Sequence, residues 1–70
     1  MMSDGTQVKA ALIRLRQVMA RTGMSRSTIY AYIKDGRFPP PIAISQRCVA
    51  WVEMDIDRWI EDRIASSRRA

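Results

Sequence analysis

Histidine is absent from this 70-residue chain, and cysteine occurs once, at Cys48. Histidine is the side chain that most often exchanges protons near neutral pH, so its absence excludes Ser–His and Cys–His catalytic pairs. A lone thiol forms no internal disulfide and supplies too few ligands for a zinc site. The chain also has no glycine-rich phosphate-binding loop. We therefore expect a protein that is not an enzyme, uses no cofactor or metal and resides in the reducing cytoplasm.

Long apolar runs are missing as well. No stretch approaches the roughly 20 apolar residues that span a membrane, and the N-terminus lacks the apolar core of a signal peptide. Apolar residues make up 47% and charged residues 27% of the chain, which is typical of a globular protein. A chain of this length forms one small domain. We place it at residues 12–67, between a flexible N-terminal arm (1–11) and a basic tail (68–70).

Positive charge is unevenly distributed along the chain. The net charge is +5, but residues 9–47 hold eight basic residues and one acidic residue, a balance of +7. Residues 48–70 hold four basic and five acidic residues, a balance of −1. A basic front and a near-neutral rear are typical of proteins that bind nucleic acid, whereas a generally soluble basic surface explains the charge equally well.

Two short helices are predicted on either side of a glycine turn. Residues 16–21 continue a helical apolar pattern, and Gly23 suits the left-handed turn that often ends a helix. Ser25 suits the cap of the next helix, residues 26–34, because its hydroxyl can accept a backbone N–H of the first turn. The predicted inward face of that helix holds Ile29, Ile33 and, on its flank, Tyr32. Two helices around such a turn are typical of a helix-turn-helix.

A β-hairpin is predicted after the second helix. Gly36 ends that helix, Phe38 is expected to anchor the chain in the core, and the prolines at 39–41 favour an extended exit. Apolar residues then alternate along two arms of residues 42–51, as strands require. They are Ile42 and Ile44 on the first arm and Val49 and Trp51 on the second.

The last predicted helix runs from residue 53 to residue 66. We expect its early acidic residues either to form a solvated face, favoured by the helix dipole, or to repel DNA and so orient the domain. Its apolar stripe consists of Ile56, Trp59, Ile60 and Ile64. Near the start of the chain, residues 12–15 are β-prone and either pair with a later strand or lead into the first helix. The predicted fold is mostly α-helical with a small β-hairpin: a winged helix-turn-helix of three helices and a wing.

The second helix and the tip of the hairpin supply the candidate DNA-binding residues. Small outward side chains let a helix enter the major groove, and an arginine or free N–H groups near its start can reach bases or phosphate. The hairpin tip can touch a phosphate or the minor groove. The candidates are Ser25, Arg26, Ser27, Thr28, Tyr30, Lys34, Gln46 and Arg47. The alternatives are a capped surface helix in a small bundle, a core role for Tyr30, and an Arg47 that bridges loop carbonyls.

Several motifs occur together at a specific spacing. They include residues 12–18 (LIRLRQV), 21–30 (RTGMSRSTIY), 33–39 (IKDGRFP) and 57–60 (DRWI), and Arg47 and the segment 49–51 (VAW) continue the series. Over residues 12–63 these motifs resemble the AlpA family of prophage regulators, whose relatives include phage excisionases and MerR-like winged-helix proteins. The resemblance implies a small DNA-binding transcriptional regulator whose DNA-facing helix is residues 26–34 and whose wing is residues 42–51.

The chain departs from the family pattern in three places. Arg16 and Gln17 stand where the family often has proline and glutamate, and Met54 stands where it tends to have serine. Both changes concern the starts of helices. Ala31 stands where the family usually has a long polar residue, and an alanine side chain cannot donate or accept a hydrogen bond. The base readout that the family resemblance implies therefore does not extend to this position.

The sequence predicts a regulator of phage or mobile-element type that binds double-stranded DNA sequence-specifically, with residues 26–34 in the major groove. Within the same chemistry, the alternative is an excision factor that bends DNA beside an integrase. An alternative of another class is a protein-interaction adaptor with a basic face. Because few residues can read bases, we expect a homodimer or a cooperative row on repeated sites. Such a protein would associate with the bacterial nucleoid.

Overall fold

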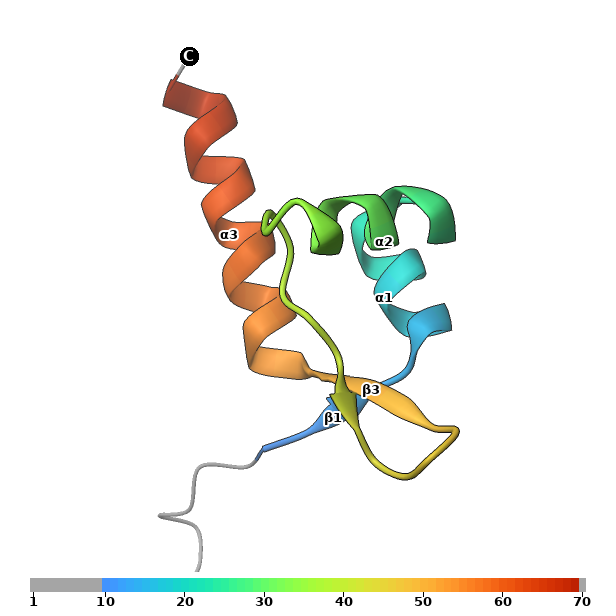
Figure 1. The fold of residues 1–70 in the computed structure, drawn as a ribbon. Coiled ribbons are helices and arrows are strands. Elements are labelled where there is room, and N and C mark those ends of the chain that lie inside the picture. Colours follow the sequence, from blue (N-terminus) through green and yellow to red (C-terminus); the bar gives the residue numbers. More distant parts are fainter. Residues whose placement is uncertain (1–9, 70) are drawn as a thin grey trace, which may run out of the picture.

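A central strand joins the beginning of the domain to its end. The computed structural model describes residues 10–69. Its elements, in chain order, are β1 (Leu12–Ile13), α1 (Leu15–Thr22), α2 (Arg26–Lys34), β2 (Ile42–Ala43), β3 (Val49–Val52) and α3 (Glu53–Arg69) (Figure 1). The three strands form an antiparallel sheet in the order β1-β3-β2. The predicted fold class is confirmed: the domain is mostly helical, with the small sheet expected of a winged helix-turn-helix.

Strand β1 pairs with β3, which decides between the two roles predicted for residues 12–15. In the register, Leu12 lies opposite Val52 and Ile13 lies opposite Trp51. The Ala11 carbonyl also accepts a hydrogen bond from the Glu53 N–H, at 2.8 Å. Of the arm expected at residues 1–11, residues 1–9 lie outside the described part of the chain, and Ala11 belongs to the folded domain.

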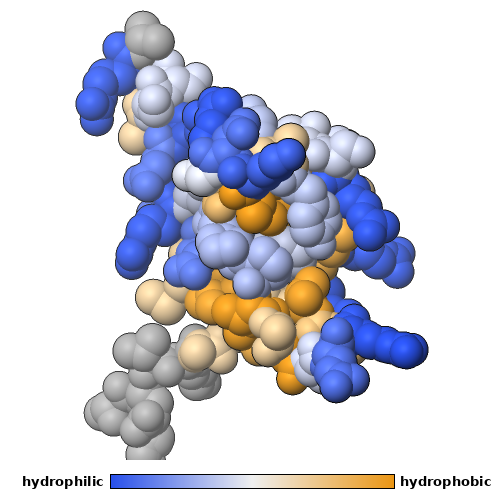
Figure 2. Space-filling model, viewed as in Figure 1, coloured by the Kyte–Doolittle hydropathy of each residue, from blue (hydrophilic) through white to orange (hydrophobic). Residues whose placement is uncertain are grey.

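The expected hairpin is formed by β2 and β3, but the isoleucines of its first arm stay outside the core. Ile42 and Ile44 are 42% and 52% exposed, whereas Trp51 on the second arm is fully buried. The reason is that α1 and α3 pack against the central strand β3, while β2 lies at the edge of the sheet. Figure 2 shows the result as hydrophobic side chains gathered at the surface over the sheet.

The core takes at least one side chain from almost every element. Its buried apolar residues are Ile13, Val18, Ile29, Phe38, Ala50, Trp51 and Ile56. The predicted inward face of α2 is confirmed, since Ile29 is fully buried and Ile33 and Tyr32 pack partly buried against the same cluster. Phe38 is buried too, as its predicted anchoring role requires.

The predicted turns between the helices are also confirmed. Gly23 has a φ of +73°, in the left-handed region, and its N–H donates to the Met19 carbonyl at 2.8 Å. Ser25 caps α2, because its Oγ accepts the Thr28 N–H at 3.2 Å. Gly36, after the end of α2, has a φ of +72°. A β-carbon is strained in this conformation, which explains glycine at both turns.

Helix α3 is longer than the sequence predicted. It continues past Ser66 to Arg69, so Arg68 and Arg69 lie on the helix instead of in a separate tail. The predicted apolar stripe is buried only in its first part: Ile56 is fully buried and Ile60 partly, but Ile64 is 46% exposed. The helix projects beyond the rest of the domain at its C-terminal end, so its last turns have little to pack against (Figure 1).

The early acidic residues of α3 are not simply a solvated face. Arg21, in the last turn of α1, donates one N–H to Glu53 Oε2 at 2.8 Å and another to Asp57 Oδ1. Both carboxylates are about 40% exposed, so each pair contributes at most about 1 kcal/mol. The two ion pairs hold the end of α1 against the start of α3. They also neutralise Arg21, one of the eight basic residues of segment 9–47.

The two isoleucines of α2 provide a test of the fold. We expect Ile29→Ala to lower the free energy of unfolding by about 2–5 kcal/mol, because the side chain leaves a cavity in a fully packed site. Ile33→Ala should cost about half as much, because that side chain is only partly buried. Urea denaturation, monitored by tryptophan fluorescence, measures both losses in the free energy of unfolding. Equal losses would show that the inward face of α2 is centred elsewhere.

Candidate nucleic-acid interface

One side of α2 faces away from the core along its whole length. The buried Ile29 and the partly buried Tyr32 and Ile33 occupy the inner side. The residues exposed on the outer side are Arg26, Ser27, Tyr30, Ala31 and Lys34. This division follows from the helical period of 3.6 residues, and it gives the outer face small side chains in the middle and basic ones at both ends.

A cleft beside the first half of α2 gathers four arginines. It has a volume of about 420 Å³ and is lined by Arg14, Leu15, Arg16, Arg26, Tyr30, Arg47 and Val49. We call it the basic cleft. Its lining includes four arginines and no carboxylate, so positive charge is concentrated around the cleft. Three separate elements supply these arginines: the start of α1, the start of α2 and the tip of the hairpin.

Local hydrogen bonds fix the backbone at the rim of the basic cleft. The Arg14 N–H donates to Gln17 Oε1 at 2.9 Å, and the Arg14 carbonyl accepts the Val18 N–H at 3.0 Å. At the hairpin tip, the N–H groups of Ile44 and Ser45 donate to the Cys48 carbonyl at 2.8 and 3.2 Å. These bonds involve neither the Arg14 nor the Arg47 side chain, and both residues are exposed.

Tyr30 connects the basic cleft to the core. Its ring lies edge-on to Trp51, with the ring centroids 6.3 Å apart and the planes at 67°. The residue is nevertheless 39% exposed and lines the cleft. An amphipathic aromatic of this kind packs through its ring and offers its hydroxyl to solvent or to a ligand. Tyr30 therefore belongs to both the edge of the core and the candidate interface.

The cleft brings together only three of the eight residues predicted from the sequence: Arg26, Tyr30 and Arg47. The hydroxyls of Ser25 and Thr28 are used within the cap, where Ser25 Oγ donates to Thr28 Oγ1 at 3.0 Å, and Thr28 is half-buried. Ser27 and Lys34 lie on the exposed side of α2 and Gln46 lies at the exposed hairpin tip, outside the cleft lining.

Two arginines of the cleft were not among the predicted site residues. Both Arg14 and Arg16 line the cleft and belong to the strongly basic segment 9–47. The positive charge of that segment was the signal in the sequence that could have indicated them. That signal marked the segment without distinguishing its members. The position of the start of α1 beside the start of α2 depends on the tertiary packing.

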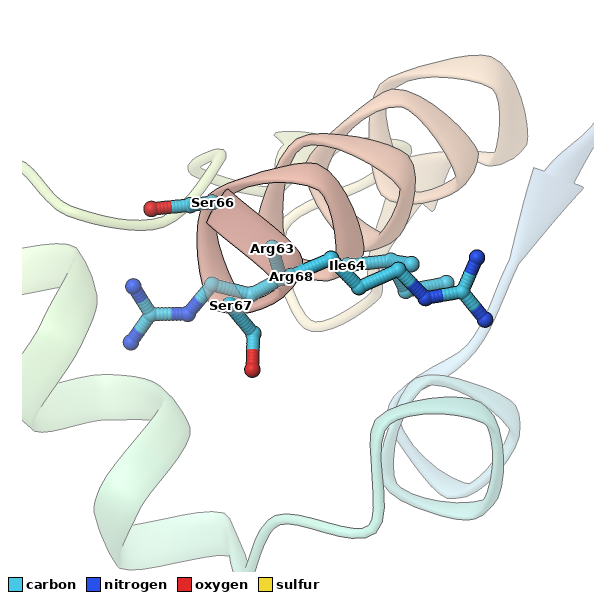
Figure 3. A pocket seen from close by; sticks show the side chains of 5 residues that line it. All are labelled: Arg63, Ile64, Ser66, Ser67 and Arg68. Atoms are coloured by element: carbon cyan, nitrogen blue, oxygen red, sulfur yellow. The ribbon is translucent and has the colours of Figure 1, made fainter. Parts of the chain in front are cut away.

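Another hollow, on α3, gathers no comparable chemistry. It has a volume of about 650 Å³ and is lined by Arg63, Ile64, Ser66, Ser67 and Arg68 of α3 alone. Figure 3 shows that the two guanidinium groups extend in opposite directions from the helix. In residues 10–69, no cluster of three or more potential metal ligands occurs, and no helix is long and apolar enough to cross a membrane.

Comparisons with known proteins agree with the resemblance drawn from the motifs. The family model of the prophage CP4-57 regulatory protein (AlpA) matches residues 11–64. An uncharacterized protein of Enterobacteria phage P4, ORF88, is 40% identical over 57 residues, which cover 81% of this chain and 65% of that protein. The chain thus spans about two thirds of the length of this relative.

A second relative carries a functional name. The DNA-binding transcriptional activator AlpA of Escherichia coli K12 is 34% identical over 58 residues, which cover 74% of this chain and 83% of that protein. No solved structure gives a significant match. The family match extends from the residue before β1 to the middle of α3 and so includes the whole basic cleft. The chain belongs to the AlpA family of prophage regulatory proteins.

Proposed function

We propose that this protein is a transcriptional regulator of phage type that binds double-stranded DNA through α2 and the basic cleft. The observation that supports this most strongly is the convergence of four arginines, without a carboxylate, at the start of an exposed helix. Neutralising several phosphates in this way releases counterions, which is a main source of affinity for DNA. The E. coli relative is named as a DNA-binding transcriptional activator, which agrees with the proposal.

In the proposed complex, α2 enters the major groove. Its nine residues extend about 13 Å, which suits a groove about 12 Å wide. Ser27 and Ala31 are small and exposed, so the helix backbone can approach the base edges closely. Arg26, at the start of the helix, reads a guanine or binds a phosphate, and Lys34 binds a phosphate at the other end.

The other arginines of the basic cleft hold α2 in register. Arg14 and Arg16 contact the phosphates of the strand that borders the groove, and the Tyr30 hydroxyl adds a neutral hydrogen bond to the same backbone. Arg47 and Gln46 extend from the hairpin tip to a phosphate or to the neighbouring minor groove. Such contacts position the helix without reading sequence themselves.

The cleft arginines can be tested with a short duplex of random sequence. We expect Arg26→Ala and Arg47→Ala each to weaken binding about tenfold at low salt, because each removes a charge-assisted hydrogen bond. Each should also reduce the slope of log K against log salt by about 0.9. Fluorescence anisotropy over a salt series measures both quantities.

Arg58→Ala is the matched control, because Arg58 is an exposed arginine of α3 outside the basic cleft. It removes the same charge and should leave affinity and slope close to those of the wild type. A wild-type protein that fails to bind the duplex at low salt would contradict the proposal and favour a basic adaptor that binds an acidic protein.

Specificity in this proposal depends on assembly. Ala31, at the centre of the exposed side of α2, offers no hydrogen bond, so one domain reads few bases. We expect two or more copies to bind repeated or adjacent sites cooperatively. Gel-shift titration on a site selected from a random pool should give a steep isotherm, and a single independent monomer site would contradict this expectation.

A role in excision is the second candidate, and one surface favours it. Leu12, Ile42 and Ile44 are exposed apolar residues of the sheet region and do not line the basic cleft. Exposed apolar patches often mark contacts with another protein, and an excision factor must contact an integrase as well as DNA. We expect such a factor to bend its site, which circular-permutation assays measure. An unbent complex that alters transcription would exclude the excision role.

A further inference from the structure

A second group of cations lies at the opposite end of α2 from the basic cleft. The Arg37 guanidinium lies over the ring of Tyr32, 4.7 Å from its centroid. The Arg63 guanidinium lies 6.0 Å from the same centroid and 5.3 Å from that of Trp59. We call Arg37 and Arg63 the stacked arginine pair. Tyr32 is in the last turn of α2, Arg37 follows the end of that helix and Arg63 is on α3, so three segments meet here.

The backbone around the pair is held on both sides. The Arg37 N–H donates to the Tyr32 carbonyl at 2.8 Å, directly after the left-handed Gly36. The Arg37 carbonyl accepts the indole N–H of Trp59 at 2.9 Å. Arg63 follows Trp59 by one helical turn, so the same tryptophan contacts both the backbone of Arg37 and the side chain of Arg63. This geometry orders two side chains that otherwise have many rotamers.

The donors of the stacked arginine pair are not used by carboxylates. Within residues 10–69, both ion pairs belong to Arg21, although Asp35 and Asp62 are close to the pair in sequence. Stacking on an aromatic ring uses the flat face of a guanidinium and leaves its in-plane N–H groups available. The guanidinium N–H groups of Arg21 are used in its two ion pairs. Arg37 and Arg63 are exposed and form no ion pair within residues 10–69, so their guanidinium N–H groups can meet a ligand.

We propose that the stacked arginine pair is a second phosphate-binding site, for the DNA strand on the side of the groove opposite the basic cleft. This inference rests on the proposed function. The two basic groups lie at opposite ends of α2, whose nine residues extend about 13 Å, similar to the roughly 12 Å width of the major groove. Each group then meets one of the two phosphate backbones that border the groove. The ordered arginines lose little further freedom on binding, and their planar forks suit phosphate oxygens.

Salt titration of binding to a random-sequence duplex tests the second site. We expect Arg37→Ala and Arg63→Ala each to lower affinity about tenfold at low salt and to reduce the log–log slope by about 0.9. Arg58→Ala again serves as the control, since it removes one exposed charge from the same helix as Arg63 and leaves the stack intact. Thermal unfolding of each variant verifies that the domain remains folded.

Removing a ring tests the role of the stack without changing the charge. Tyr32→Leu keeps an apolar side chain against the core but removes the surface under Arg37, and we expect a loss of affinity of about two- to fivefold. The slope should stay close to that of the wild type, because the number of cations is unchanged. A folded Tyr32→Leu variant with unchanged affinity would show that the ring does not prepare Arg37 for phosphate.

The outcomes separate this inference from the proposed function. If Arg26→Ala and Arg47→Ala weaken binding while Arg37→Ala and Arg63→Ala leave affinity and slope unchanged, the second phosphate site is wrong and the proposed function stands. If the wild-type protein does not bind duplex DNA, both fail. Losses at both ends of α2, with the Arg58→Ala control unaffected, support a helix held between two strands.

Discussion

The contacts of Trp51 connect the sheet of this small domain to α2 and to the segment that follows α2. The residue is fully buried on the central strand and lies opposite Ile13 of β1. Its indole N–H donates to the Pro39 carbonyl at 3.0 Å, and its ring meets the ring of Tyr30. One side chain thus links the first strand, the linker after α2, the hairpin and α2 itself. The position of the exposed side of α2 relative to the hairpin depends on these contacts.

Much of the local structure could be predicted from the sequence, because its causes lie within a few residues. Ser25 accepts a bond from an N–H three residues later, Gly23 adopts the left-handed turn, and the inward face of α2 follows from helical spacing. The pairing of β1 remained open and the extent of α3 was underestimated. The pairing of β1 depends on a strand from a distant part of the chain, which no local pattern records. The added residues of α3 are exposed, so its extra length does not come from packing against the core.

The site was less predictable than the fold, and its arginines show why. Charge composition marks a basic segment, but it does not separate an arginine that stabilises the domain from one that meets a ligand. Arg21 lies between two carboxylates, Arg14 lines the basic cleft and Arg37 stacks on a tyrosine. All three belong to the same basic stretch of sequence. Only their partners, which come from distant parts of the chain, distinguish them.

The position of β1 also has a consequence for the order of folding. Leu12 lies opposite Val52, so the first strand of the domain has no partner until the chain has been synthesised as far as β3. During synthesis, α1 and α2 can form local turns, but the core remains open until Trp51 of β3 and Ile56 of α3 have left the ribosome. Long-range pairing of this kind slows folding relative to a purely helical bundle of the same size. The helix-turn-helix therefore reaches its final geometry only when the end of the domain closes over its beginning.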